Sequence, residues 1–301
     1  MAFILLKIFP VILIFILGYF LKKGKLLSKE NADLFLKMNY YIALPSLLLV
    51  TVTNIKLDFE FVYLPIIAIL VVLLIFCVSW FVGKKVFNLE NKTLGVFLVG
   101  TMIMNMGIVY PFIIAAYGNE GIVRASLFDL GNGLMAYTFV YYFACRYGSN
   151  KSNSRVMIKK FLLSMPLVAL FLGIVLNLLS LKLPSFLNES FSILGAMVIP
   201  LIMLSLGIYF TPKLIKLKPL ISGLVIRMGL GLVLGLIFVK IFNFDQLTSL
   251  VVLISSAAPI GYNTLTFSAL ENLDKEFAAS LVSASIFLGI IYIPLLMLIF
   301  S

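Results

Sequence analysis

Hydrophobic residues in this chain form long runs that are separated by short polar segments. A helix needs about 20 mainly apolar residues to cross the hydrocarbon layer of a bilayer. Ten runs approach or exceed that length, so the pattern predicts an all-α membrane protein with ten transmembrane helices. The predicted spans are Phe3–Leu21, Leu34–Thr53, Phe61–Val82, Thr93–Tyr117, Ile122–Arg146, Phe161–Leu179, Ser190–Phe210, Ile221–Phe242, Leu247–Leu270 and Phe277–Phe300.

Two of these spans carry helix-breaking residues, at equivalent places in the two halves of the chain. The fourth span contains Asn105, Gly107 and Pro111, and the ninth contains Pro259 and Gly261. Proline removes a backbone donor and glycine lets the chain leave helical angles, so each span should divide into two half-helices. Inside a membrane, freed backbone is tolerated where protein or a polar cavity satisfies it, and paired interruptions point to a transporter's binding site.

Asparagines accompany both predicted breaks. Asn105 precedes the first proline and Asn263 follows the second. Their amides can bind a carboxylate or cap the broken backbone, and the sequence leaves both roles open. A half-helix N-terminus carries a partial positive charge of about half a unit, which favours anions. The candidate substrate-binding residues are Asn105, Gly107, Pro111, Asn132, Pro259, Gly261 and Asn263.

The fifth span contains an acidic residue, which is costly in a membrane and usually functional. Helical spacing places Asp129 on one face with Ser126, Asn132, Gly133 and Ala136. Asp129 could carry a proton, bind a cation, pair with a basic residue or hydrogen-bond to freed backbone. We expect Asp129 and Ser126 to form a polar or ion-coupling network near the first break.

The eighth span has small residues every fourth position, which permits close helix contact. These are Gly223, Gly231 and Gly235, with Arg227 among them. We expect the glycines to pack against another helix and Arg227 to reach the membrane interface with its long side chain. Because no arginine or lysine is near either break in sequence, a bound anion should rest on amides and half-helix termini.

Hydroxyl residues surround the second break. Their oxygens are possible ligands for sodium, but hydrogen bonds to carbonyls of their own helix are favoured. They are Ser255, Ser256, Thr264, Thr266 and Ser268.

Composition agrees with a membrane protein and removes several other classes. Of 301 residues, 62% are hydrophobic and 12% are charged, whereas a soluble domain is about half apolar and a quarter charged. The chain has no histidine, and its two cysteines, Cys77 and Cys145, are too few for a metal cluster or a disulfide framework. We expect no metal and no cofactor, and interpret both cysteines as packing residues.

The net charge is +11, and the basic residues lie mostly between the spans. They therefore indicate the orientation of the protein in the membrane rather than binding to nucleic acid. The first, third, fifth and seventh connections with their flanks hold 16 basic residues, and the other five connections together hold five. The basic side should be cytoplasmic. This predicts a multi-pass protein of the plasma membrane with both termini outside the cytoplasm.

The chain divides at a polar stretch, Gly148–Ser154, with five predicted spans on each side. Because five is odd, the second half must enter the membrane from the opposite face. We predict two inverted repeats, residues 1–147 and 161–301, with a cytoplasmic linker at 148–160; chance alignment of apolar segments is the alternative. Matching pairs 154 or 155 residues apart are Pro45 with Pro200, Gly107 with Gly261, Asn105 with Pro259, and Ser126 with Ser280.

At these motifs the chain resembles the auxin efflux carrier family, which includes bacterial malate and malonate permease-like proteins. The resemblance rests on Asn105–Pro111, Ala116–Gly121, Phe128–Asn132, Ala258–Gly261, Phe277–Ser280 and Ile293–Pro294. The family commonly has one more residue between the asparagine and the proline of the first break. Positions that match the family's functional residues are Asn105, Pro111, Asn132 and Pro259.

The resemblance implies ten helices with broken helices 4 and 9 crossing beside a bound carboxylate. It also implies a scaffold of helices 1, 2, 6 and 7, a moving transport domain of helices 3–5 and 8–10 in an elevator-like cycle, and a homodimer. The expected function is secondary transport of small organic anions, such as a dicarboxylate or an auxin-like weak acid, with H⁺ or Na⁺ coupling undecided. A sodium-coupled carrier of the bile-acid type is the alternative. An enzyme is disfavoured because histidine and paired aspartates are missing, and a channel because no filter motif is present.

Overall fold

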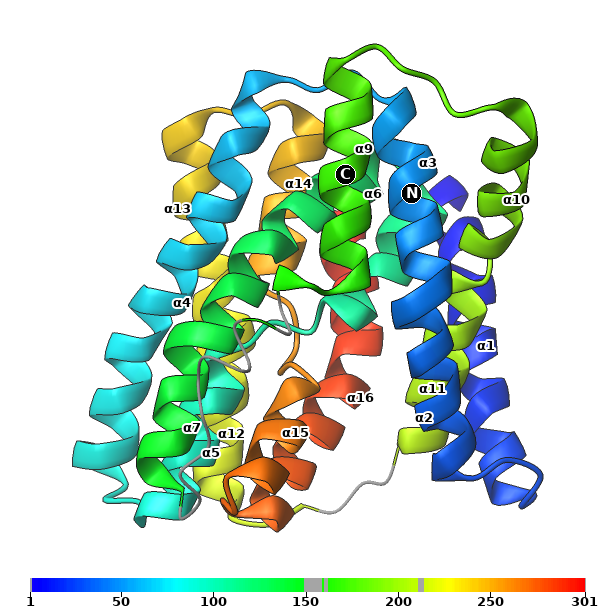
Figure 1. Cartoon of the computed structure of the whole chain (residues 1–301). Coiled ribbons are helices and arrows are strands. Elements are labelled where there is room, and N and C mark those ends of the chain that lie inside the picture. The colour runs from blue at the N-terminus through cyan, green and yellow to red at the C-terminus, as the bar shows by residue number, and fades with distance from the viewer. Residues whose placement is uncertain (1, 149–158, 160–161, 211–213, 301) are drawn as a thin grey trace.

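The structure is a computed structural model that describes residues 2–148, 159, 162–210 and 214–300. The predicted linker at 148–160 therefore lies almost wholly outside the described residues. Helices make up nearly all of the described chain and form one bundle (Figure 1). They are α1 (Ala2–Lys23), α2 (Lys29–Met38), η1 (Asn39–Ala43), α3 (Leu44–Asn54), η2 (Phe59–Val62), α4 (Tyr63–Phe81), η3 (Val82–Val86), α5 (Asn91–Met102), α6 (Met106–Met135), η4 (Ala136–Val140), α7 (Tyr141–Tyr147), α9 (Met165–Leu178), α10 (Ser185–Gly195), α11 (Val198–Tyr209), α12 (Leu217–Leu224), η5 (Val225–Leu230), α13 (Gly231–Phe242), α14 (Gln246–Ser256), α15 (Asn263–Leu270) and α16 (Lys275–Phe300).

Six helical stretches within the described residues are long and apolar enough to cross a bilayer. The outer surface of the bundle is also apolar: Leu74, Phe171, Ile237 and Phe287 are all exposed. Side chains of this kind on helix exteriors suit a lipid environment, and the prediction of an all-helical membrane protein is confirmed. The six stretches are Lys29–Asn54, Phe59–Val86, Met106–Tyr147, Ser185–Tyr209, Leu217–Phe242 and Lys275–Phe300.

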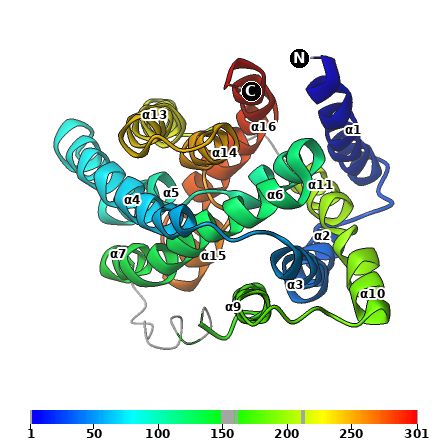
Figure 2. The ribbon, with the colours of Figure 1, turned by 90° about the horizontal axis from the view of Figure 1, so that it is seen from above.

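The helices form two groups that meet along α6. Figure 2 shows α1, α2, α3, α9, α10 and α11 on one side and α4, α5, α7, α13 and α14 on the other. Within the first group α1 packs on α11 and α3 packs on α9, while in the second α4 packs on α5 and α13 on α14. Helix α6 contacts members of both groups, so it lies at their boundary.

Proline and glycine mark the irregular points of several helices. A π-helical segment, η1, leads directly into the helix that contains Pro45, and α10 ends three residues before Val198, where the helix with Pro200 begins. Within α6, Gly118 has φ 56° and ψ −140°, a conformation that side chains with a Cβ rarely adopt. Gly118 therefore separates two differently directed arms of α6.

The two cysteines are both free. Cys77 is exposed on the outside of α4 and Cys145 is partly buried. The interpretation of Cys77 as a packing residue was therefore wrong, because it faces outward from a helix whose whole circumference is apolar.

Candidate functional site at the helix crossing

The fourth predicted span breaks over three residues, Ile103 to Asn105, between α5 and α6. Gly107 and Pro111 lie beyond this break, in the first turns of α6. Because proline has no N–H, the carbonyl of Gly107 lacks its usual partner four residues along the helix. These two residues thus loosen the start of α6 rather than form the break itself.

The ninth predicted span breaks over six residues, Ala257 to Tyr262, between α14 and α15. Pro259 and Gly261 lie inside this break, and Asn263 is the first residue of α15. The break therefore occurs where the sequence predicts it.

The two breaks lie against each other and pair like short antiparallel strands, with Met104 opposite Ile260. The Asn105 N–H donates to the Pro259 carbonyl, and the Gly261 N–H donates to the Ile103 carbonyl, each at 2.9 Å. A Cβ on Gly261 would overlap the side chain of Ile103, so only glycine allows this approach. Each break thus satisfies backbone groups that the other has freed, as a membrane interior requires.

Side-chain amides complete the pairing. The Asn105 side chain donates to the Ile260 carbonyl at 3.2 Å. Asn132 accepts from the Met104 N–H at 3.1 Å and donates to the Met104 carbonyl at 3.3 Å. Of the two roles that the sequence leaves open for Asn105, the structure shows capping of the broken backbone, and Asn132 caps it as well.

Asp129 joins this network from α6. Its carboxylate accepts hydrogen bonds from Asn132 at 2.8 Å and from the Tyr110 hydroxyl at 2.7 Å. The carboxylate has no ion pair within the described residues. Ser126 donates to the Ile122 carbonyl of its own helix at 2.7 Å. Asp129 is therefore held beside the first break, through side chains rather than directly on the backbone.

Arg227 also lies at the crossing, which corrects the expectation that it reaches the membrane interface. Its side chain is fully buried. One terminal nitrogen donates to the carbonyls of Thr101 at 3.2 Å and Met102 at 3.3 Å, and the other donates to the carbonyl of Ser256. These are last-turn carbonyls of α5 and α14, which have no partner within their own helices. One guanidinium therefore caps both broken helices.

The glycines of the eighth span explain how Arg227 reaches this position. A Cβ on Gly231 would overlap the Ser256 carbonyl, and one on Gly235 would lie 3.1 Å from the Ser256 side chain. Close packing of these glycines is thus confirmed, and it brings Arg227 against the breaks. Arg227 also lies in a π-helical segment, η5, a distortion that is frequent at functional sites. The sequence did not reveal this role because Arg227 is far from both breaks along the chain. An arginine inside an apolar span was nevertheless a signal of function.

Comparison with known proteins identifies the family of the chain. The model of a family described as membrane transport protein matches residues 3–297. The chain belongs to this membrane transport family. The resemblance to auxin efflux carriers is thereby confirmed at the level of the family.

Two relatives of this transporter are themselves named only as uncharacterized transporters. One, from Methanocaldococcus jannaschii, is 29% identical over 279 residues, which cover 90% of each chain. The other, from Methanothermobacter thermautotrophicus, is 25% identical over 295 residues, which cover 96% of this chain and 95% of the relative. The likeness therefore extends over both breaks and both halves.

Four of the five hydroxyl residues around the second break of the transporter do not bond to their own helices, contrary to expectation. Four buried hydroxyls have no hydrogen-bond partner in the part of the chain that the structure describes. By contrast, Thr101 at the first break donates to the Phe97 carbonyl at 2.8 Å. The Asn263 amide makes a 3.4 Å contact with the Tyr137 hydroxyl, and Thr266 is exposed. The four hydroxyls belong to Ser255, Ser256, Thr264 and Ser268.

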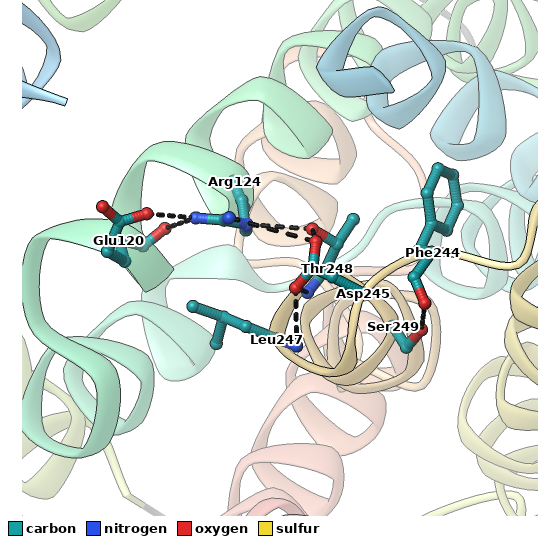
Figure 3. A network of polar contacts seen from close by, with 7 residues as sticks. All are labelled: Glu120, Arg124, Phe244, Asp245, Leu247, Thr248 and Ser249. Atoms are coloured by element: carbon teal, nitrogen blue, oxygen red, sulfur yellow. Dashed lines mark hydrogen bonds and ion pairs between the residues drawn. The ribbon is translucent and has the colours of Figure 1, made fainter. Parts of the chain in front are cut away.

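The outer ends of the broken helices are held by hydrogen bonds and ion pairs that involve charged side chains. At the start of α14, Arg124 donates to Thr248 at 2.9 Å and forms an ion pair with Glu120 at 2.6 Å (Figure 3). Asp245 accepts from the N–H groups of Leu247 and Thr248, which caps the helix. Arg124 thus joins the second arm of α6 to α14.

The start of α5 has a similar network. Asp274 accepts from Thr93 at 2.8 Å and from Lys216 at 2.6 Å. Burial alone would raise the pKa of Asp274, but hydrogen bonds from Lys216, Thr93 and a backbone N–H together lower it. The pKa of Asp245 is lowered in the same way, since hydrogen bonds from Thr248 and the nearby Arg124 outweigh burial. Both aspartates are therefore held in their charged form.

Proposed function

We propose that this protein is a secondary transporter of small organic anions and that it binds a carboxylate where the two broken helices cross. The observation that carries the proposal is the pairing of Met104 with Ile260. It brings the N-termini of α6 and α15, which begin at Met106 and Asn263, to the same place. Helix N-termini attract anions through unpaired N–H groups and a partial positive charge.

The proposal includes two inverted repeats of five helices, residues 1–147 and 161–301. Helices α5 and α14, of 12 and 11 residues, begin 155 residues apart in the chain. Thr93 and Thr248, also 155 residues apart, each donate to an aspartate at the outer end of their helix. This correspondence supports a common plan for the two halves beyond chance alignment of apolar segments.

The two helix groups on either side of α6 support an elevator-like cycle. The group with α1, α3, α9 and α11 contains the predicted scaffold spans, and the crossing belongs to the other group, which would move relative to it. We further propose a homodimer in the plasma membrane with both termini outside the cytoplasm, as the loop charges predict.

Uptake into liposomes containing the purified protein tests the proposal. Labelled malonate, malate and indole-3-acetate are the probes, and their neutral amides are controls. We expect uptake of at least one acid, lost in a Gly261→Val variant whose side chain would overlap Ile103. Absence of uptake for every acid, or equal uptake of an acid and its amide, would contradict anion transport.

A sodium-coupled carrier is a second candidate because four buried hydroxyls at the second break lack partners. Buried hydroxyls without partners are rare in proteins and call for an ion, water or ligand. The same liposomes with sodium replaced by potassium on both sides decide between the two. Uptake that needs sodium favours this candidate, and uptake that does not excludes it.

A further inference from the structure

We propose that Arg227 supplies the positive charge by which the helix crossing selects anions. This inference rests on the proposed function, since it explains how a carboxylate is preferred at the crossing. It identifies a specificity-determining residue outside both broken helices.

The charge of Arg227 is buried without an acidic partner. The side chain is fully buried, and no ion pair joins it to a carboxylate within the described residues. A buried charge is strongly unfavourable unless nearby groups compensate it. Here the compensating groups are the carbonyls of Thr101, Met102 and Ser256, which accept its hydrogen bonds.

These carbonyls are the negative ends of two helix dipoles. Each helix C-terminus carries about half a negative charge, so the ends of α5 and α14 together carry about one. One guanidinium therefore balances both. The hydrogen bonds of its two terminal nitrogens go to carbonyls only, and its Nε is buried without a partner within the described residues.

The charge of the whole crossing follows from its four helix ends. The N-termini of α6 and α15 contribute about half a positive charge each, and the C-termini of α5 and α14 about half a negative charge each. Alone, these four ends sum to nearly zero and would not favour an anion. With Arg227 neutralising the two C-termini, about one positive charge remains at the two N-termini, which matches one carboxylate.

Asp129 opposes this effect. It is tied to the first break through Asn132, which bonds to both Asp129 and Met104. A charged carboxylate here would cancel the surplus that Arg227 creates. Neutralising Arg227 should therefore weaken anion binding and neutralising Asp129 should not, whereas simple damage to the crossing would weaken binding in both cases.

The test measures binding to detergent-purified protein by calorimetry. Malonate, malate and indole-3-acetate are tried on the wild type, and the tightest binder becomes the probe, with its neutral amide as control. For Arg227→Gln we expect affinity for the acid to fall roughly thirtyfold, the effect of a unit charge about 8 Å away at an effective dielectric constant of about 20. Arg227→Lys, which keeps the charge, should retain most of the affinity.

Further measurements distinguish an effect of charge from an effect on the fold. Melting temperature and size-exclusion profile report folding of each variant. Asp129→Asn, whose amide occupies the same place, should bind the acid at least as tightly as the wild type. Binding of the amide, if measurable, should not change in Arg227→Gln.

Several outcomes would overturn the inference. These are unchanged acid affinity in folded Arg227→Gln, equal losses in the Gln and Lys variants, or weaker binding in Asp129→Asn. The last result decides the question even if Arg227→Gln does not fold. A wild type that binds none of the three acids identifies a failure of the proposed function itself.

Discussion

The two breaks look equivalent in sequence but differ in how their polar groups are satisfied. The first spans three residues, and Asn132 bonds to both backbone groups of Met104 there, while the Asn105 side chain donates across to Ile260 in the second break. The second spans six residues and is flanked by buried hydroxyls without partners in the described chain. The backbone of the first break is therefore held by a side chain, whereas the unpaired hydroxyls beside the second break are available to an ion or ligand.

Under the proposed inverted repeat, this difference corresponds to one position in the following helix. Asn132 braces the first break from α6. The position 154 residues later, the offset that relates Gly107 to Gly261, is Ile286, a buried apolar residue in α16. An isoleucine side chain cannot hydrogen-bond to a break, so the second half has no counterpart of Asn132. On the proposed repeat, the replacement of one polar side chain would make the two halves differ.

The largest effect should come from adding a side chain at Gly261, where the two breaks are in contact. In Gly261→Ala a Cβ would overlap Ile103, whereas in Gly107→Ala it would lie 3.2 Å from the Asn105 side-chain oxygen. We expect Gly261→Ala to lower the free energy of unfolding by about 1–3 kcal/mol and to lose most uptake. Gly107→Ala should have a smaller effect on both. Equal effects in melting and uptake assays would show that the pairing does not depend on this glycine.

The second-largest effect should come from removing the Asn132 side chain, which holds the backbone of the first break. Asn132→Ala leaves the N–H and carbonyl of Met104 without their side-chain partner, at a cost of about 1–3 kcal/mol. Asn105→Ala loses one bond, to Ile260, and should cost about 1 kcal/mol while the protein stays folded. Thermal melting orders the two variants, and reversed order would contradict the bracing role of Asn132.

Asn105→Ala also tests substrate binding. We expect reduced uptake of the acid probe in liposomes, with melting behaviour close to the wild type. Uptake equal to the wild type would remove Asn105 from the binding residues and leave it a backbone cap only.

The hydroxyl groups beside the two breaks provide another comparison between them. Thr264→Val removes a buried hydroxyl that has no partner, so the free energy of unfolding should rise by about 1 kcal/mol. Thr101→Val removes a hydroxyl that already bonds to Phe97 and should bring no such gain. Loss of uptake in Thr264→Val, with or without lower stability, would instead favour an ion or ligand at the second break.

The smallest effect concerns pH at the outer networks. The pKa of Asp274 is lowered in the folded protein, so its stabilising contribution is present above the ordinary value of about 4 and is lost as pH falls through the folded value. Because Lys216 is partly exposed, this contribution should be below about 1 kcal/mol. Melting curves of wild type and Asp274→Asn should therefore differ at pH 6 and approach each other as pH falls below about 4. A constant difference would contradict an electrostatic role.

The sequence by itself determined the features that depend on local chemistry. Apolar run length predicts helices, and proline with glycine predicts the breaks, because each acts on its own backbone within one or two turns. The family resemblance also followed from short motifs such as Asn105–Pro111.

Tertiary structure alone decided how the breaks are held. Arg227 caps Thr101 from 126 positions away, and Asn105 reaches Ile260 across 155. Such partners depend on which helix faces meet and how closely glycine lets them approach, which periodicity does not encode. The same packing left the hydroxyls of Thr264 and Ser268 without carbonyl partners, although local preference favours a bond within the helix.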